Sequence, residues 1–359
     1  MAIFDASKEW VILFPPDVPD AKKAAGDLAR YIGLLAGSTG GLAEKPPVLM
    51  DATGPAPPET VPLIVLNSRD SDSGQNGFTW RAESERVEIY GESGRGLCNG
   101  IYSFLAALGI SWPAVGQESI PSPAVKDTRE FSLSENRVHE PSKYEGKDPA
   151  AAPWRRFVPA GRKTIKSIFK RSEAFAAWAA RQRYDALIFP LAAFASGTSA
   201  RKLKELKKIA GEYGIAIEAG GRDLSSLVPR RFFFFRRDFF RMEEGRREKA
   251  HHFCPTNPGT IRLIGREAGK LFRAAAAGEA RVFHLWPDKG AEETWCSCPT
   301  CRAFTPPEQN RISVNAAADV LAVLSPGASI TFFEKTGEMG SISLRQNIFG
   351  METLPDDGG

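Results

Sequence analysis

The sequence predicts an α/β fold in two units, a small α+β unit followed by a (β/α)8-type barrel. Three observations lead to this prediction. The chain has 359 residues, which exceeds one ordinary small domain. Short strands and helices alternate through residues 1–130. Over residues 131–359, longer amphipathic stretches separate the strands, which is typical of a parallel sheet or barrel. These two ranges are the expected domains.

The first unit is expected to have the order β-α-β-β-α. Its opening strand is the apolar run in EWVILFPPD, which paired prolines end. A helix over 19–37 follows, because its apolar residues recur at steps of three and four. Strands at 63–67, 77–83 and 86–91 come next, and the last two read as a hairpin. A glycine turn then begins a second helix, which Gly109 ends.

Five strands can be assigned in the second unit, with amphipathic helices between them. They lie at 135–140, 184–192, 214–221, 280–288 and 328–334. A complete eight-stranded barrel takes roughly 250 residues, and only about 230 follow the first unit. We therefore expect a barrel that is truncated at its C-terminal side, near a sixth strand. An open, doubly wound sheet is the alternative.

Charge and composition argue against several partners and locations. The 47 basic and 43 acidic residues leave a net charge of +4, too small to predict nucleic acid or an anionic membrane as a partner. No segment approaches the roughly 18 apolar residues of a membrane-spanning helix. The first residues lack a signal-peptide pattern, and the five cysteines do not suggest a disulfide framework. We expect a cytoplasmic protein.

Three cysteines are clustered in a C-x-C-x-x-C segment, namely Cys296, Cys298 and Cys301. This spacing brings three sulfur atoms toward one centre, as a tetrahedral zinc site requires. A fourth ligand would be Cys254 or one of the histidines His251, His252 and His284. The prediction is a structural zinc ion, with no cofactor required for the function. A loop of reduced cysteines is the alternative.

The predicted strand RVFHLWPD carries polar residues on one face. Its alternation places His284, Trp286 and Asp288 on the same side. The C-terminal ends of barrel strands form the mouth of the active site, so Asp288 lies where catalytic carboxylates are found. A turn-forming Asp is the alternative. Glu292 and Glu293 follow within reach, and glycosidic cleavage requires paired carboxylates. An exposed tryptophan beside them would provide a platform for a sugar ring.

Other strand ends supply further candidates for substrate binding. His139 and Glu140 lie at the end of the strand at 135–140, and Arg222 with Asp223 follows the paired glycines of the strand at 214–221. A basic and aromatic stretch, VPRRFFFFRRDFFRMEEGRREK, comes soon after Arg222. We expect this stretch to bury its phenylalanines beneath arginine side chains. Rings that stack on bases or sugars are the alternative.

Four segments together resemble a bacterial family described as domain of unknown function 4838, relatives of β-hexosaminidases and α-glucuronidases. The segments are GRGLCNGIYSFLAALGISWPAVGQESIP, YGIAIEAGGRDLSSLVP, HHFCPTNP and WPDKGAEETWCSCPTC. The resemblance implies a hexosaminidase-like α/β domain, a (β/α)8 barrel and a carbohydrate ligand. Family 20 hexosaminidases end their fourth strand in His-x-Gly-Gly-Asp-Glu. The segment HLWPDK matches this motif at His284 and Asp288, has Lys289 in place of the acid, and Arg222 replaces a histidine common in relatives.

We therefore expect a carbohydrate-active, glycoside hydrolase-like protein that acts on an oligo- or polysaccharide. Asp288 is the predicted functional carboxylate, and Glu292 or Glu293 is its acid partner. The substrate-binding residues would be His284, Trp286, Arg222 and His139. Two alternatives stay open. One is a non-catalytic glycan-binding protein or degenerate barrel fragment, which Lys289 favours, and the other is a zinc-stabilised interaction module.

Overall fold

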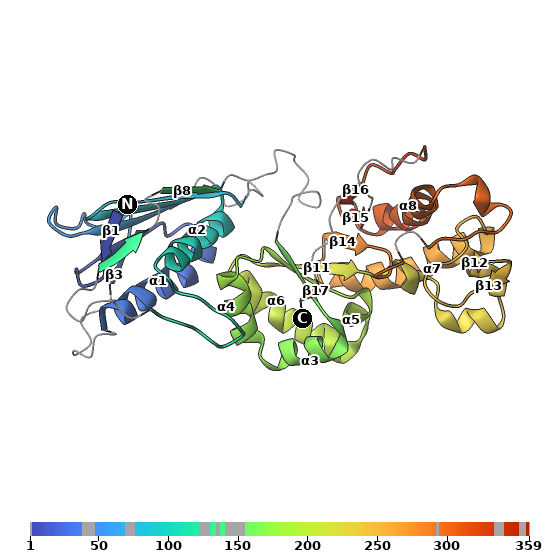
Figure 1. Cartoon of the computed structure of the whole chain (residues 1–359), viewed down its shortest axis with the longest axis horizontal. Helices are drawn as coiled ribbons and strands as arrows, with labels where there is room; N and C mark the ends of the chain where they lie inside the picture. The colour runs from blue at the N-terminus through green and yellow to red at the C-terminus, as the bar shows by residue number, and fades with distance from the viewer. Residues whose placement is uncertain are drawn as a thin grey trace.

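The structure is a computed structural model that describes residues 2–37, 47–68, 76–121, 130–133, 137–140, 155–291, 294–333, 341–351 and 357–358. Two units lie side by side along its long axis, an N-terminal unit in blue to cyan and a barrel unit in green to red (Figure 1). No helix within the described ranges is long and apolar enough to cross a membrane.

The N-terminal unit contains a mixed sheet and two helices. Its strands are β1 (Ala2–Asp5), β2 (Val11–Phe14), β3 (Val48–Asp51), β4 (Leu63–Ser68), β5 (Phe78–Ala82), β6 (Arg86–Gly91), β7 (Glu130–Leu133) and β8 (Arg137–Glu140), and its helices are α1 (Pro19–Gly37) and α2 (Gly94–Ala107). Six strands form the sheet β3-β2-β4-β6-β5-β8, and β1 pairs with β7. β5 is antiparallel to both of its neighbours, whereas the other pairs in the six-stranded sheet are parallel.

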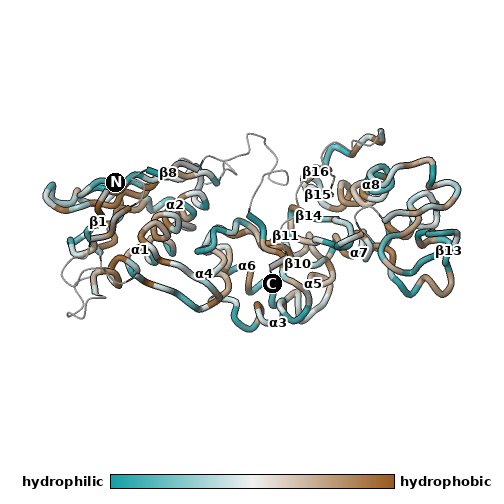
Figure 2. The backbone as a smooth tube through the Cα atoms, viewed as in Figure 1, coloured by the Kyte–Doolittle hydropathy of each residue, from teal (hydrophilic) through white to brown (hydrophobic). Residues whose placement is uncertain are grey.

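Aromatic side chains fill the core of the N-terminal unit. Hydrophobic residues occur along α1 and α2, which are brown over part of their length in Figure 2. The Trp10 ring stacks on Phe4 with centroids 4.7 Å apart. The ring of Phe104 from α2 meets Phe4 and Trp80 edge-on at 5.5 and 5.4 Å. Such edge-on pairs stabilise a core beyond the burial of their area. Ser93 caps the start of helix α2, because its hydroxyl accepts the amide hydrogen of Gly96.

The barrel unit is built on a seven-stranded parallel sheet. Its strands are β9 (Arg156–Pro159), β10 (Ala186–Phe189), β11 (Ala216–Gly221), β14 (Val282–Leu285), β15 (Ser329–Phe333), β16 (Ile348–Met351) and β17 (Asp357–Gly358), and its helices are α3 (Gly161–Lys170), α4 (Ser172–Arg181), α5 (Leu191–Ala195), α6 (Gly197–Gly211), α7 (Pro258–Ala277) and α8 (Pro306–Leu324). Strands β9 to β16 follow one another across the sheet in chain order, and β17 pairs with the far edge of β9. This strand order is that of a (β/α)8-type barrel.

A long loop interrupts the barrel between β11 and α7. It contains three short 3-10 helices, η1 (Leu224–Leu227), η2 (Arg230–Phe234) and η3 (Arg237–Phe239), and a hairpin of β12 (Met242–Glu243) with β13 (Arg246–Arg247). A fourth 3-10 helix, η4 (Cys301–Ala303), precedes α8. Both features lie beyond the C-terminal ends of the parallel strands, where barrels carry their functional loops.

The strand expected at 135–140 does not belong to the barrel. Residues Arg137–Glu140 form β8, which pairs antiparallel with β5, so His139 lies opposite Thr79 in the N-terminal sheet. Because β8 pairs with β5, the N-terminal sheet extends to Glu140. This pairing favours a boundary between the two units after Glu140. The first barrel strand is instead β9, which is only four residues long and lies in a segment whose many basic residues hide its apolar pattern.

The two glycines that end β11 permit a close approach to β14. Gly220 and Gly221 have φ values of +114° and +116°, a conformation that other residues rarely adopt. A Cβ atom on Gly220 would lie 2.1 Å from the backbone oxygen of His284. Glycine is therefore required at position 220 for β11 to pack against β14. The segments that directly follow these two strands contain the candidate site.

Buried polar contacts join the two units. Arg95 of α2 lies 3.4 Å from the Asp185 carboxylate and donates to the backbone oxygens of Tyr184 and Tyr213 at 2.8 and 3.0 Å. Asn99 donates to the same carboxylate oxygen of Asp185 at 3.2 Å. Arg95, Asn99 and Asp185 are all buried, so these contacts compensate for the removal of the Arg95 and Asp185 charges from water.

Candidate functional site

Two carboxylates lie just beyond the ends of adjacent barrel strands. Asp223 is the second residue after β11, and Asp288 is the third after β14. Strands β11 and β14 are parallel neighbours, with Gly221 opposite Leu285. The side chain of Arg222, predicted to bind substrate, donates to the backbone oxygen of Pro287 at 3.3 Å and links the two strand ends. Asp288 therefore lies at the barrel mouth, where its strand position predicted it.

The long loop after β11 supplies the partners of Asp288. The Ser225 hydroxyl donates to one oxygen of Asp288 at 2.6 Å, and Nδ1 of His251 lies 3.6 Å from the other. His251 has a φ of +59°, a left-handed conformation that is rare for residues other than glycine. Arg230 donates to the backbone oxygen of His251, while its buried Nη1 has no hydrogen-bond partner among the described residues. This group is a cationic donor available beside Asp288.

The environment of Asp223 favours its protonated form. The pKa of Asp223 is raised to about 6, and burial is the largest cause. A hydrogen bond from the Leu191 amide acts in the opposite direction, and the negative charge of Asp288 adds to the increase. That amide hydrogen bond is 2.7 Å long. A carboxyl group that holds its proton close to neutral pH, beside a second carboxylate, has the electrostatic arrangement of an acid and base pair.

A buried polar network lies inside the barrel, on β9, β11, β14 and β15. Glu218 accepts hydrogen bonds from Arg156 Nε at 2.7 Å and from His284 Nε2 at 2.8 Å. Burial would raise the pKa of Glu218, but the Arg156 charge and the His284 hydrogen bond outweigh it and lower the pKa to about 2. Burial also lowers the pKa of His284, despite the opposite effect of Glu218. We therefore assign an ionised Glu218 and a neutral His284.

The same network fixes Trp286 in the interior. The Trp286 indole donates to Thr331 Oγ1 at 3.0 Å, which leaves the Thr331 hydroxyl hydrogen to donate to His284 Nδ1 at 2.6 Å. Because Glu218 accepts from His284 Nε2, the ring nitrogen Nδ1 must be the acceptor. Trp286 is only 1% exposed and His284 is fully buried. The expected exposed tryptophan platform is therefore wrong, since Thr331 and the interior packing hold the ring away from the solvent.

Four cysteines meet beside the barrel mouth. The sulfur atoms of Cys254, Cys296, Cys298 and Cys301 all lie within 4.8 Å of one another, and all four residues are buried. Cys254 Sγ lies 3.7 Å from that of Cys298 and 3.6 Å from that of Cys301. Two thiolates bound tetrahedrally to one zinc ion at ~2.3 Å are about 3.8 Å apart. Of the candidates for the fourth ligand, Cys254 is the one that joins the other three.

The donors around the sulfur atoms also fit a metal site. The Met242 amide donates to Cys296 Sγ at 3.2 Å, and Arg247 Nη1 lies 3.7 Å from the same atom. Donors of this kind orient metal ligands and offset the negative charge of thiolates. The four residues could thus hold a zinc ion, which would supply structural cross-linking only, because four protein ligands leave it no open position.

The cysteines connect the two loops that carry the carboxylates. Cys254 precedes α7, where Asn257 caps the helix by accepting from the amides of Gly259 and Thr260. The other three cysteines precede α8, whose capping box joins Thr305 and Glu308. Cys254 on one side, and the three other cysteines on the other, are therefore each followed by a well-capped helix. The cluster connects the loop after β11 to the loop after β14.

A stacked pair of rings strengthens the same connection. His252 lies flat on Trp295, with centroids 4.2 Å apart and planes 7° apart. His252 Nε2 also lies 2.8 Å from the backbone oxygen of Ala291. These contacts hold the segment that carries His251 against the segment that follows Asp288.

Some predicted site residues cannot be placed in the site. Glu292 and Glu293 lie outside the described residues, and nothing is described of the side chain of His139, whose backbone is in the N-terminal sheet. The sequence interpretation did not include Glu218, Ser225 or Arg230. An acidic residue within the otherwise small and apolar strand AIEAGG is a signal that would have indicated Glu218.

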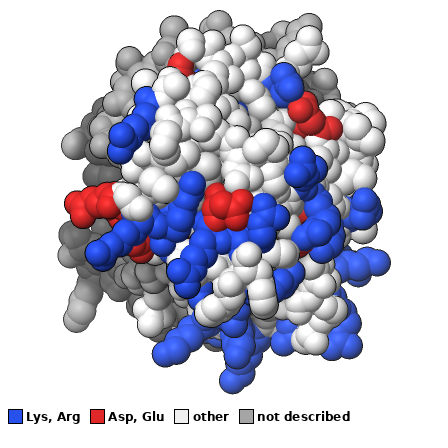
Figure 3. Space-filling model, turned by 90° about the vertical axis from the view of Figure 1, so that its right-hand side faces the viewer, with Lys and Arg blue, Asp and Glu red and all other residues white. Residues whose placement is uncertain are grey.

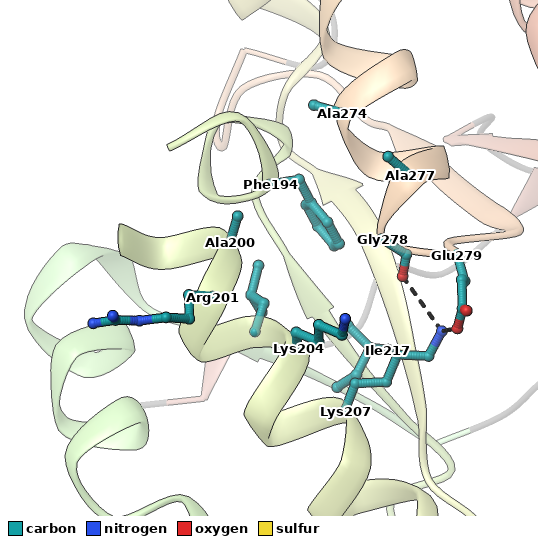
Figure 4. A pocket seen from close by; sticks show the side chains of 11 residues that line it. Phe194, Ala200, Arg201, Lys204, Lys207, Ile217, Ala274, Ala277, Gly278 and Glu279 are labelled. Carbon is teal, nitrogen blue, oxygen red and sulfur yellow. Dashed lines mark hydrogen bonds and ion pairs between the residues drawn. The ribbon is translucent and has the colours of Figure 1, made fainter. Parts of the chain in front are cut away.

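A cavity of about 530 Å³ lies elsewhere, between α6 and the end of α7. Its apolar part includes Phe194, Leu203 and Ile217, and at its edge Lys207 bonds to Gly278 and Glu279 (Figure 4). Ile217 stands near the start of β11, and Glu279 precedes β14. Because the strands are parallel, this cavity is at the opposite end of the sheet from Asp223 and Asp288 and is not part of the candidate site.

Comparisons with known proteins bear on the fold. No family model matches the chain, and no curated protein matches it. An inactive mutant of the GH20 exo-β-N-acetylglucosaminidase from Vibrio harveyi has a similar structure, with a TM-score of 0.51 and 11% identity over 97% of this chain and 54% of that chain. For the GH20 β-N-acetylhexosaminidase from Streptomyces coelicolor A3(2), the TM-score is 0.49 and the identity 11%, over 97% of this chain and 66% of that chain.

This chain thus spans 54% and 66% of the lengths of the two enzymes. The similarity to the Vibrio harveyi structure confirms the predicted α/β fold with its barrel-type sheet. The resemblance to the domain of unknown function 4838 family is not confirmed by a family model. What the comparisons establish is a fold shared with a GH20 enzyme.

Proposed function

We propose that this protein is glycoside hydrolase-like and binds an oligo- or polysaccharide at the C-terminal ends of β11 and β14. The proposal includes the relation to the domain of unknown function 4838 family. The observation that carries it is the pair of carboxylates on adjacent strand ends, Asp223 with a pKa raised to about 6 and Asp288 held by Ser225 and His251.

In the proposed reaction Asp223 is the acid and Asp288 the charge-stabilising carboxylate. Protonated Asp223 gives its proton to the glycosidic oxygen as the bond to the anomeric carbon breaks. Ionised Asp288 stabilises the positive charge that develops on the sugar. Water then attacks the anomeric carbon and passes a proton to the Asp223 carboxylate, which restores the acid. Glu292 and Glu293 remain alternative acids in this proposal.

Neighbouring side chains are proposed to bind the sugar. Arg222 and His251 flank Asp288, and Arg230 offers a buried donor without a partner among the described residues. His284 and Trp286 would support the site from the interior through Glu218 and Thr331 rather than touch the sugar. His139 has no role in this form of the proposal, because its strand pairs with β5.

The four-cysteine cluster is proposed to hold a structural zinc ion. The ion would cross-link the loops after β11 and β14 and so keep Asp223, His251 and Asp288 in register. This role explains why the cysteines lie beside the barrel mouth without contributing to the reaction, and it requires no cofactor for the chemistry itself.

Hydrolysis of aryl glycosides tests the proposal. The GH20 neighbours make 4-nitrophenyl N-acetyl-β-glucosaminide the first substrate, followed by a panel of other aryl hexosides and uronides. Asp288→Asn should lower kcat/KM by about 10²-fold or more, as expected for loss of a catalytic carboxylate. The control is Asp319→Asn, because Asp319 is on α8 and forms an exposed ion pair with Arg345. Wild-type turnover by Asp288→Asn would rule out the assigned role.

A second candidate is glycan binding without turnover. Lys289, an exposed residue, directly follows Asp288 at the position where family 20 hexosaminidases place the acid. Calorimetry with chitooligosaccharides distinguishes the two functions. Binding that Asp288→Asn weakens, with no product from any glycoside of the panel, would select the binding protein.

A further inference from the structure

Two adjacent phenylalanines stand out from the loop after β11. Phe234 is 71% exposed and Phe235 is 84% exposed, at the end of η2. The rest of the aromatic run behaves as expected, since Phe239 and Phe240 are buried and Phe232 and Phe233 pack against the core. Neighbouring large apolar side chains that are this exposed mark an interaction surface rather than a fold requirement.

Basic residues of the same loop lie next to this aromatic run. The exposed residues Arg231, Arg237 and Lys249 have no carboxylate within ion-pair distance among the described residues, whereas Arg236 is paired with Asp238 at 2.9 Å. Lysine and arginine side chains gather over the lower part of this end of the molecule (Figure 3). The net charge of the whole chain is only +4 and does not reveal this local excess of basic residues. The expectation of no membrane partner was based on that overall charge.

The shape of the patch favours a bilayer over a polymer. A ring that is more than two thirds exposed projects from the surface and can enter a bilayer interface, whereas a sugar or base stacks on an open ring face. The cations also occupy ring faces. Lys249 Nζ lies 4.7 Å from the centre of Phe234, Arg237 lies 5.5 Å from that of Phe233, and Arg231 lies 5.3 Å from that of Phe232.

We propose that Phe234 and Phe235 insert into the interface of an anionic lipid bilayer while Arg231, Arg237 and Lys249 contact the lipid head groups. Phenylalanine enters the boundary between head groups and acyl chains, and each basic residue near an anionic surface strengthens binding. Neither contribution alone gives stable attachment, so the two together predict reversible association. This proposal stands independently of the proposed hydrolase function.

Sedimentation with large unilamellar vesicles tests the surface. The full chain is mixed with vesicles of phosphatidylcholine alone, or of phosphatidylcholine with about 30 mol% phosphatidylserine. We expect binding to the mixed vesicles at least tenfold tighter than to the neutral ones, with a loss of affinity as salt rises. Equal binding to both vesicles, or none to either, would overturn the proposal.

Matched variants separate the apolar and charged contributions. The double variant F234S/F235S should weaken binding at least tenfold, and R231Q/R237Q/K249Q should remove the preference for phosphatidylserine. The control is Val323→Ser, since Val323 is 80% exposed on α8 and lies outside the patch. All substituted side chains are at the surface, so the variants are expected to fold. An unchanged thermal unfolding midpoint verifies this for each variant.

A polyanion control distinguishes the remaining partners. If heparin or an oligonucleotide binds with similar affinity, and F234S/F235S binds it as well as the wild type does, the charges serve a polyanion and the lipid proposal is wrong. A tryptophan at the tip, F235W, adds a direct signal. The chain has seven native tryptophans, so the signal is the difference between F235W and the wild type. This difference spectrum should shift to shorter wavelength on anionic vesicles, and an unchanged one would contradict insertion of the ring.

Discussion

His284 and Glu218 are joined by a 2.8 Å hydrogen bond between adjacent strands inside the barrel, and both side chains are buried. Arg156 completes the arrangement at 2.7 Å from the same carboxylate oxygen. The contact lies deeper in the barrel than Asp288, which is the third residue after the end of β14. The polar interior therefore supports the strand ends that carry the candidate site.

Loss of the Glu218 charge should destabilise the barrel. Glu218→Gln leaves Arg156 buried without its counter-charge, so the free energy of unfolding should fall by about 3–5 kcal/mol. Urea unfolding at neutral pH measures the change. The matched control is Glu88→Gln, which removes an exposed ion pair with Arg86 and should cost less than about 1 kcal/mol.

The pH dependence of the same pair has a definite sign. The pKa of Glu218 is lowered to about 2 in the folded state. Its contribution to stability is therefore fully present above the unfolded value near 4.5 and is lost as the pH falls from there toward 2. Equal losses of stability for Glu218→Gln and Glu88→Gln would contradict the importance of the buried network.

Asp223 should act on stability in the opposite direction. Its folded pKa is raised to about 6 from a usual value of 3.8, so its ionisation opposes folding as the pH rises through that interval. Between pH 4 and about 6.5, the wild type should lose stability relative to Asp223→Asn, which cannot ionise. Chemical unfolding across this range provides the test, and parallel curves for the two proteins would show that the carboxyl group is not buried as described.

Metal analysis should find about one zinc ion per chain, because four thiolates complete a tetrahedral site. Cys254→Ser or Cys298→Ser should abolish tight zinc binding and lower the thermal midpoint. Cys98→Ser is the control, because Cys98 is buried in α2, away from the cluster. Zinc retained equally in all three variants, or absent from the wild type purified without chelator, would disprove the metal site.

Gly220→Ala should disrupt the pairing of β11 with β14. A Cβ atom would lie 2.1 Å from the His284 backbone oxygen, at a φ of +114°. We expect a loss of more than about 2 kcal/mol in the free energy of unfolding. The control is Gly26→Ala in α1, where nothing lies within 4 Å and alanine should stabilise the helix by about 0.5–1 kcal/mol. A mild effect at Gly220 would mean that the two strands can separate at little cost.

Continuous apolar strands and periodic helices were predictable, whereas short strands interrupted or flanked by proline, glycine or charge were not. The strands expected at 184–192, 214–221, 280–288 and 328–334 correspond to β10, β11, β14 and β15. Strands β3, β9 and β16 were missed because β3 (VLMD) lies in a Pro-rich stretch, β9 (RFVP) lies among basic residues and β16 (IFGM) is interrupted by a glycine. The strand at 135–140 was assigned to the wrong sheet, since pairing partners distant in sequence leave no mark in local periodicity.

The candidate site divides in the same way. Asp288, Arg222 with Asp223, and the cysteines were predictable from position at a strand end or from spacing. Alternation correctly grouped His284 with Trp286, but could not show that Thr331, 45 residues beyond Trp286, would hold the indole ring in the interior. The exposure of Phe234 and Phe235 was likewise hidden, because a run of apolar residues in sequence predicts burial.

The pH dependence of kcat/KM for the best aryl glycoside tests the paired carboxylates most directly. If Asp223 is the acid, the rate should fall as the pH rises above about 6, and Asp223→Asn should lose both this limb and about 10²-fold or more in rate. Asp319→Asn should reproduce the wild-type profile. A wild-type rate that stays constant from pH 5 to about 8, or an Asp223→Asn variant with the wild-type profile, would contradict the account.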